Sequence, residues 1–153
     1  MRKILLLTLA SLSIASVELA TRKALNLTSI KTMVAAAETE AAKRKVEVTI
    51  CIVDESGNVL FLQKGDGAGL NTINYAEKKA RHSAFFRAPS KNAVDQLKAG
   101  NNAILVMPNS FPNQGGLPIK VDGQTIGAIG VSGAASDVDE AIGQVAIDAI
   151  LKK

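Results

Sequence analysis

Side chains that could bind an iron-containing ring gather within one short stretch, residues 71–87. Residues spaced three, four and seven positions apart lie on one side of a helix. In this stretch they are Tyr75, Lys78, Lys79, His82 and Phe86. An imidazole or a phenolate is an axial ligand of haem iron, and lysines pair with carboxylates such as the haem propionates. Aromatic side chains provide walls for the porphyrin. The pattern therefore predicts a haem site, with His82 as the first candidate for the iron ligand.

The same helix also has a purely structural interpretation. A lone helical histidine is often a surface or interface residue, and Tyr75 and Phe86 would then pack between subunits of an oligomer. The opposite side of the helix is narrow and is expected to lie close against a sheet. It consists of Ile73, Ala76, Ala80 and Ala84.

The stretch 115–133 has the pattern of a β-hairpin. Asp122-Gly123 is a two-residue turn of the kind that needs positive φ at both positions, and apolar or β-branched residues flank it. The second strand has glycines at positions 127, 130 and 133. Glycine inside a strand indicates that another group approaches the backbone closely.

This hairpin reads Gly-Gly-x-Pro-Ile-x-Val-Asp-Gly and then Ile-Gly-Ala-Ile-Gly-Val-Ser-Gly. Further characteristic segments are 52–60, 76–80 and 87–90. On these segments the chain resembles the haem-degrading domain family over roughly residues 27–151. That family includes GlcG-like proteins, secreted HbpS-like haem-binding proteins and the C-terminal domain of PduO-type proteins.

The resemblance implies a profilin-like α-β-α sandwich with a five-stranded sheet, haem as the ligand, and assembly into homo-oligomers. The family's Lys-Ala-x-Thr-Ala pattern corresponds to residues 79–83, so His82 replaces a hydroxyl residue. This departure leaves the identity of the iron ligand open, although histidine is the stronger ligand of the two.

Helix and strand patterns follow one another as helix, two strands, two helices, three strands and helix. The expected helices are 28–45, 71–87, 90–99 and 137–151, and the expected strands are 46–53, 59–63, 103–107 and the two arms of the hairpin. Thr28 or Ser29 is the predicted N-cap of the first helix, and Ser136, with Asp139 three residues later, that of the last. Because tight turns join both strand pairs, we expect an α+β fold with a largely antiparallel sheet.

The N-terminus has the pattern of a secretory signal. Met1-Arg2-Lys3 is basic, residues 4–12 are apolar, and small residues precede a cleavage point after Ala15. We therefore expect a signal peptide (1–15), a linker (16–26) and one domain (27–153), with the mature protein in the periplasm or outside the cell. The apolar run is too short for a membrane span, which needs ~20 residues. The alternative is an uncleaved helix packed on the domain.

Composition argues against several other classes of protein. The net charge is +4, and removing Arg2 and Lys3 leaves 16 basic and 14 acidic residues, or +2, which is too small to indicate nucleic-acid binding. Aromatic residues make up only 3% of the chain, so stacking platforms for single strands are not expected. One histidine and one cysteine cannot form a His/Cys zinc site within one chain. Cys51, on a predicted strand, is expected to be a small packed side chain.

Together these features predict an exported haem-binding protein that stores, takes up or degrades haem, and that forms homo-oligomers. Enzymatic activity stays open, because the sequence does not distinguish haem storage from haem breakdown. Two alternatives belong to other classes: a module that binds a corrinoid or another small molecule, and a non-catalytic oligomeric scaffold.

Overall fold

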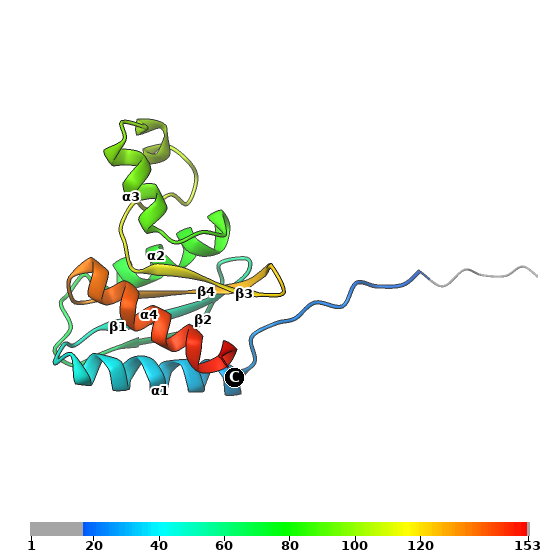
Figure 1. Ribbon diagram of the computed structural model, residues 1–153, viewed down its shortest axis with the longest axis horizontal. Coiled ribbons are helices and arrows are strands. Elements are labelled where there is room, and N and C mark those ends of the chain that lie inside the picture. Colours follow the sequence, from blue (N-terminus) through cyan, green and yellow to red (C-terminus); the bar gives the residue numbers. More distant parts are fainter. Residues whose placement is uncertain (1–16, 153) are drawn as a thin grey trace, which may run out of the picture.

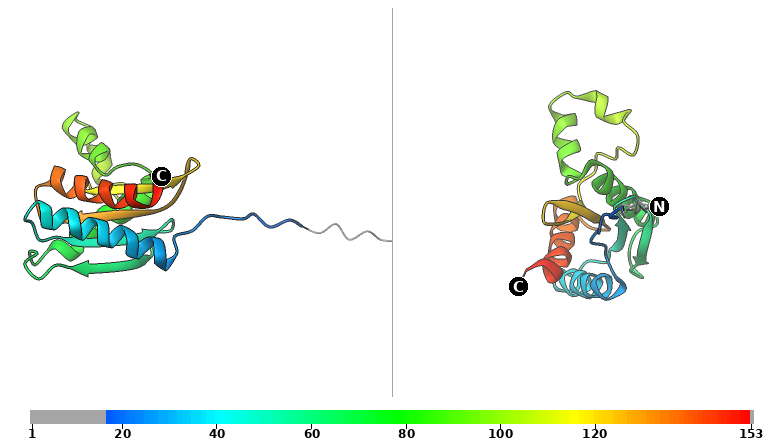
Figure 2. Two further views of the ribbon diagram at one scale, coloured as in Figure 1. Left: turned by 60° about the horizontal axis from the view of Figure 1, so that its bottom comes forward. Right: turned by 90° about the vertical axis from the view of Figure 1, so that its right-hand side faces the viewer.

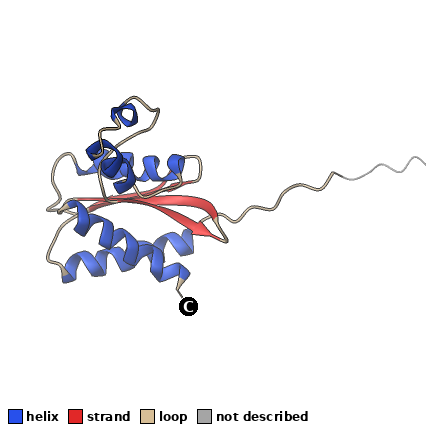
Figure 3. Cartoon of the chain, turned by 45° about the horizontal axis from the view of Figure 1, so that its top comes forward, coloured by secondary structure: helices blue, strands red, loops and turns tan. Residues whose placement is uncertain are grey.

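The computed structural model describes residues 17–152, which form a sheet with helices on both faces (Figures 1 and 3). The elements are α1 (Leu27–Lys43), β1 (Thr49–Asp54), β2 (Val59–Lys64), α2 (Thr72–Phe86), α3 (Lys91–Lys98), the 3-10 helix η1 (Asn102–Leu105), β3 (Gly116–Val121), β4 (Gln124–Ser132) and α4 (Ser136–Leu151). Residues 17–26 form no helix or strand and lead into α1, whereas the predicted signal peptide lies outside the described residues.

The four strands are antiparallel and stand in the order β2-β1-β4-β3. β4 is central: its Ile129 lies opposite Ile52 of β1 and Leu117 of β3. The turn between β3 and β4 has φ values of 49° at Asp122 and 78° at Gly123, so the predicted hairpin is confirmed. The predicted α+β class and the antiparallel character of the sheet are confirmed with it.

The expected fifth strand does not exist. Within residues 103–107 the chain forms most of η1 and then a loop, and Val106 is 84% exposed. Helix α3 and η1 stand out from the body of the molecule, so this apolar run never reaches a sheet edge (Figure 2). The prediction was wrong because a short apolar run does not by itself distinguish a strand from other structures. The profilin-like relationship stays a prediction.

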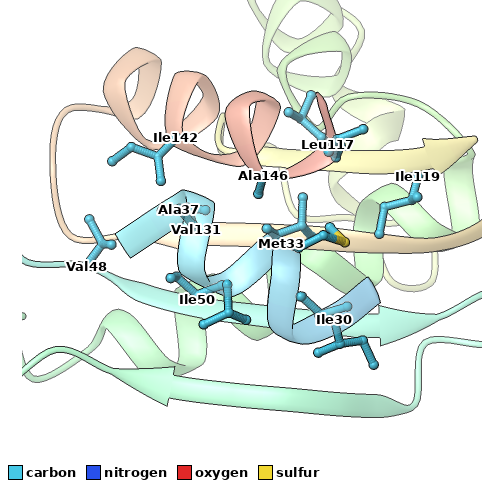
Figure 4. Close-up of a cluster of buried hydrophobic side chains, with 14 of the residues drawn as sticks. Ile30, Met33, Ala37, Val48, Ile50, Leu117, Ile119, Val131, Ile142 and Ala146 are labelled. Atoms are coloured by element: carbon cyan, nitrogen blue, oxygen red, sulfur yellow. The ribbon is translucent and has the colours of Figure 1, made fainter. Parts of the chain in front are cut away.

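The larger core lies between the sheet and the pair α1 and α4 (Figure 4). Met33 of α1, Ile52, Ile129 and Ile142 of α4 are completely buried there. Burial of each such side chain contributes about 1.5–3 kcal/mol. The helical spacing of the apolar residues in α1 is therefore explained by this face of the sheet.

The other face of the sheet is covered by α2, through alanines rather than large side chains. Ala76, Ala80 and Ala84 are buried, as predicted, but Ile73, which was expected on the same side, is 37% exposed. A Cβ on Gly130 of β4 would lie 2.0 Å from the carbonyl oxygen of Ala76. Glycine at this position thus lets the helix backbone rest directly on the strand. The close approach predicted from the glycines is confirmed here, and the approaching group is the protein's own helix.

The helix starts differ from those predicted. Helix α1 is capped by Asn26, whose side chain accepts the N–H of Ser29 at 2.8 Å, while the Ser29 hydroxyl oxygen accepts the N–H of Asn26. Helix α4 has Ala135 at its N-cap, and Ser136 makes no capping bond. Instead Asp139 accepts the N–H of Ala134 at 2.9 Å. None of the helices within residues 17–152 is long and apolar enough to cross a membrane.

Candidate ligand-binding site at helix α2

Three side chains of α2 and the loop beside it form a surface cluster, in which Tyr75 and Lys78 are exposed and Phe111 is half-buried. The rings of Tyr75 and Phe111 meet edge to face, with centroids 5.5 Å apart and planes at 66°. The Lys78 ammonium lies 5.6 Å from the centre of the Phe111 ring, a distance at which cation and ring attract. Tyr75 is 39% exposed. The cluster offers a phenol, a cation and an aromatic surface to a ligand arriving from solvent.

Phe111 was not among the residues predicted for this site. It belongs to the loop 108–116, where prolines and glycines are the only local signals in the sequence. Its position beside Tyr75 results from the path of the loop after η1, which returns to the start of β3 over helix α2. No local pattern could have indicated this contact.

His82 lies beneath the same loop and is only 2% exposed. Its Nδ1 accepts the N–H of Phe111 at 3.0 Å, and its ring stacks on Phe86 at 4.4 Å between centroids. Because Nδ1 is an acceptor, the proton of the neutral ring is on Nε2. Burial lowers the pKa of His82 below 6.5, against a smaller opposing effect from the backbone of Asn109. In this arrangement His82 is a neutral packed residue, and a ligand in solvent reaches it only if the loop moves.

The sequence pattern predicts Lys79 on the same exposed stripe as Lys78. The structure does not place it there. It is 2% exposed, and its ammonium donates to Asp139 Oδ2 at 2.8 Å and to the carbonyl of Val131 at 2.9 Å. The spacing does permit this position, because Ala76, Lys79 and Ser83 fall at i, i+3 and i+7 of the buried side. The predicted stripe placed Lys79 beside Lys78 by helical spacing, and this placement was wrong for Lys79.

Asp139, the partner of Lys79, comes from the first turn of α4 on the opposite face of the sheet (Figure 3). Its Oδ1 accepts the N–H of Ala134, and its Oδ2 accepts from Lys79. Burial raises the pKa of Asp139, although the hydrogen bond and charge of Lys79 work against that rise. The ion pair therefore connects the two helical layers past the end of β4. From the sequence, Asp139 is expected only to help cap the start of helix α4.

The Gly-Gly sequence before β3 leaves room for this ion pair. Gly115 has φ of 120°, and a Cβ there would lie 2.8 Å from the ammonium nitrogen of Lys79. A Cβ on Gly116 would lie 2.2 Å from the Lys79 carbonyl oxygen. Gly115 thus leaves room for the Lys79 ammonium, whereas Gly116 lets β3 approach the backbone of α2.

A pocket of about 470 Å³ opens beside the ion pair, where the N-terminal turns of α2 and α4 meet the end of β4. Its polar lining includes Thr72, Tyr75, Lys79, Asn113, Ser132 and Asp139. Of the five predicted site residues, the structure brings Tyr75 and Lys79 to this pocket. Lys78 does not line the pocket but contacts Phe111, which in turn contacts Tyr75, and His82 and Phe86 are stacked on each other.

The other candidates for chemistry are the Cys51 thiol and possible metal ligands. Cys51 is buried on β1 as predicted, and burial raises the pKa of its thiol to about 12. Such a thiol is a packed side chain rather than a nucleophile. Among the residues that the structure describes, no group of three or more histidine, cysteine or acidic side chains lies together as a metal site would require.

Comparison with known proteins agrees with the resemblance in the hairpin. The family described as "Haem degrading protein HbpS-like" matches residues 25–148. The chain is 34% identical to protein GlcG of Escherichia coli strain K12 over 100 residues, which cover 65% of this chain and 75% of GlcG.

Solved structures give the same relationship. A structure titled as a PduOC:heme complex superposes with a TM-score of 0.79 at 26% identity, covering 84% of this chain and 96% of that one. A crystal structure of HbpS gives a TM-score of 0.79 at 30% identity, covering 92% and 100%. On the sequence match and the shared fold, this chain belongs to the HbpS-like family of haem-degrading proteins.

Proposed function

We propose that this protein is exported and binds haem, and that it stores, takes up or degrades it. The observation that carries the proposal is the surface cluster of Tyr75, Lys78 and Phe111 on a chain of the HbpS-like family. A similar structure, PduOC, is described as a complex with heme. Export rests on the pattern of residues 1–15.

The described residues fit haem at this surface in three respects. The Tyr75 phenol is exposed and can act as an axial ligand, the Phe111 ring can lie against a porphyrin, and the Lys78 ammonium can pair with a propionate. Bound haem would supply iron that takes such a ligand and, in a degrading enzyme, the ring that is cleaved. The chain's own residues orient the ring and keep one side of it against protein.

His82 fits haem iron less directly, because its Nδ1 accepts a hydrogen bond, its ring stacks on Phe86 and its side chain is buried. Its role as ligand stays a prediction, and it requires the loop containing Asn109 and Phe111 to release the imidazole. Tyr75 needs no such movement. Coordination by Tyr75 and coordination by His82 are therefore expected to differ in the rate of haem binding and in the resulting spectrum.

Titration of the purified protein with haemin tests the proposal. We expect a saturable shift of the Soret band relative to free haemin, with about one haem per chain at the end point. A spectrum identical to that of free haemin throughout would contradict haem binding. It would leave the corrinoid module and the oligomeric scaffold as the remaining functions.

A further inference from the structure

The pocket between α2, β4 and α4 is lined by polar side chains that have unused hydrogen-bonding capacity. Ser132, the last residue of β4, is 7% exposed and lines the pocket, and its side chain makes no hydrogen bond to any described residue. Tyr75 and Asn113, which line the same pocket, also have side chains without a hydrogen bond within residues 17–152. Tyr75 is 39% exposed, so this group of side chains is open to solvent and can hydrogen-bond to a ligand that enters the pocket.

The ammonium of Lys79 has one hydrogen-bonding position left. It has three N–H groups, of which Val131 and Asp139 accept two. Both oxygens of Asp139 are already used, one by Lys79 and one by the N–H of Ala134. The pocket therefore presents donors: an ammonium N–H, hydroxyls and an amide. A ligand rich in acceptors matches it best.

The charges define the ligand further. Asp139 balances Lys79, so the pocket can take one extra negative charge more readily than two, because a second charge would face the carboxylate of Asp139. A carboxylate has one charge and two acceptor oxygens, which suit a lysine N–H and a serine hydroxyl together. A phosphate dianion fits this site less well.

Stability alone does not explain the ion pair, since buried pairs are often no more stabilising than apolar residues of the same volume. Here a Cβ on Gly115 would also lie 2.8 Å from the ammonium nitrogen of Lys79, so glycine at this position keeps the room that the ammonium needs. A buried charged pair in the wall of a pocket is typical of a binding or active site.

We propose that this pocket binds the carboxylate group of an organic acid through Lys79 and Ser132. The carboxylate belongs either to a free small acid or to a propionate of bound haem, and the chemistry of the site is the same in both cases. With a free acid the proposal goes beyond haem binding, and with a propionate it rests on the proposed function. The experiments below distinguish these sources.

The first experiment titrates the full chain, free of haem, with sodium propionate, and follows backbone amide signals by NMR. Sodium chloride at equal ionic strength is the reference, and sodium phosphate is the competing anion. We expect saturable shifts at Lys79, Ser132 and their neighbours, and weaker binding of phosphate. Shifts that do not saturate, or that phosphate reproduces at the same concentrations, would overturn the proposal.

Two variants connect the binding to these residues. Ser132→Ala removes one hydrogen bond and should weaken propionate binding roughly three- to tenfold. The double change Lys79→Met with Asp139→Leu replaces the ion pair by apolar side chains, a change that buried pairs often tolerate, and should abolish binding. Unchanged affinity in either variant would refute the assignment. If the double variant does not fold, Ser132→Ala decides by itself.

Matched controls make the same chemical changes away from the pocket. Ser56→Ala alters an exposed serine in the turn between β1 and β2, and Lys98→Met alters an exposed lysine at the end of α3. Both should bind propionate as the unchanged protein does. Equal losses in the controls would show that binding does not depend on the pocket and would overturn the proposal.

Competition with haemin identifies the source of the carboxylate. If haemin displaces propionate, and Ser132→Ala also weakens haemin binding, the natural carboxylate is a haem propionate. If propionate binds equally well to haem-saturated protein, it is a free acid. Both results support a carboxylate site. A protein that binds propionate but never shifts the Soret band would refute haem binding and leave the carboxylate site standing.

Discussion

At the scale of single residues, burial decides what each polar side chain on α2 can do. Lys78 and Lys79 are neighbours in sequence, yet one lies over an aromatic ring at the surface and the other is 2% exposed in an ion pair. Tyr75 and His82 are both possible iron ligands, but only the phenol faces solvent. The chemistry of the helix therefore depends on which side of it each residue occupies.

Single substitutions should identify the iron ligand. If His82 coordinates iron, His82→Ala should move the Soret band and weaken haem binding at least tenfold, about 1.4 kcal/mol. If Tyr75 is the ligand, Tyr75→Phe should do so instead. Lys78→Ala should weaken binding by about 1 kcal/mol or less, because exposed ion pairs contribute little. Haemin titrations of the three variants measure this, and an unchanged spectrum in His82→Ala excludes that residue.

His82 should also make stability depend on pH. Its pKa in the folded protein is lowered by burial, so the unfolded chain takes up a proton near pH 6.5 while the folded protein does so only at lower pH. The free energy of unfolding should therefore fall as the pH drops below 6.5, by at most about 1.4 kcal/mol per pH unit.

Urea unfolding near pH 7.5 and near pH 5.5 measures this dependence, and His82→Gln is the control. The raised pKa of Asp139 acts in the opposite direction, favouring the folded protein as the pH falls from that raised value towards 3.8. Because both proteins contain Asp139, their difference reports His82 alone. Parallel slopes in the two proteins would contradict a buried neutral imidazole.

At the scale of elements, the distance between α2 and β4 positions the whole site. Gly130 lets the helix backbone come within contact of the strand, and Ala76, Ala80 and Ala84 keep that layer thin. Lys79 can reach Asp139 on the far layer only because α2 lies this close to the end of β4. The small residues on this side of the helix thus place Lys79 within reach of Asp139.

Gly130→Ala should separate these elements. Its Cβ would lie 2.0 Å from the Ala76 oxygen and 2.6 Å from the Ala80 nitrogen, both backbone atoms that cannot turn away. We expect a loss of about 1–3 kcal/mol in urea unfolding. Gly143→Ala in α4 is the matched control, since its Cβ would meet only ordinary contacts at 3.5 Å or more. It should be neutral or stabilising by up to about 1 kcal/mol. Equal effects of both changes would disprove the close-packing explanation.

At the scale of the whole molecule, the body is a closed sandwich from which α3 and η1 project (Figure 2). The tip of this projection exposes three consecutive apolar residues, Leu105, Val106 and Met107. β2, an edge strand, exposes Leu60 and Leu62 as well. Apolar surface of this kind is typical of a contact with another protein chain.

We predict a homo-oligomer, a dimer or a larger even-numbered assembly, because self-association usually gives closed symmetric assemblies. Light scattering at micromolar concentration should give a multiple of the 16.0 kDa chain mass, less the signal peptide if it is removed. If the projection takes part, Val106→Asp should shift the mass towards the monomer. A monomer alone in the unchanged protein would refute the prediction.

Export is tested on the protein from its native host. We expect cleavage after Ala15, because residues 1–15 have the basic start, apolar stretch and small terminal residues of a signal peptide. Intact mass spectrometry of the protein and cell fractionation measure this. A protein that begins at Met1 and is found only in the cytoplasm would contradict the prediction.

The sequence by itself determined those features that depend on neighbours along the chain. The periodicity of residues 28–45 predicted α1 to within two residues of Leu27–Lys43, and Asp122-Gly123 fixed the hairpin. The family motif in residues 115–133 identified the relatives that the comparisons later confirmed. Each of these signals is local, since helical period, turn chemistry and motif spacing are set by residues a few positions apart.

Only the tertiary structure decided which of the candidate residues meet. Lys79 and Asp139 are 60 positions apart, and His82 and Phe111 are 29 apart. Whether a lysine at helical spacing points to solvent or to a buried carboxylate depends on what packs against that side of the helix. The run 103–107 likewise had no partner strand once α3 carried it away from the sheet. Long-range packing chooses among several local possibilities, because the free energy of burial depends on partners that the local pattern does not contain.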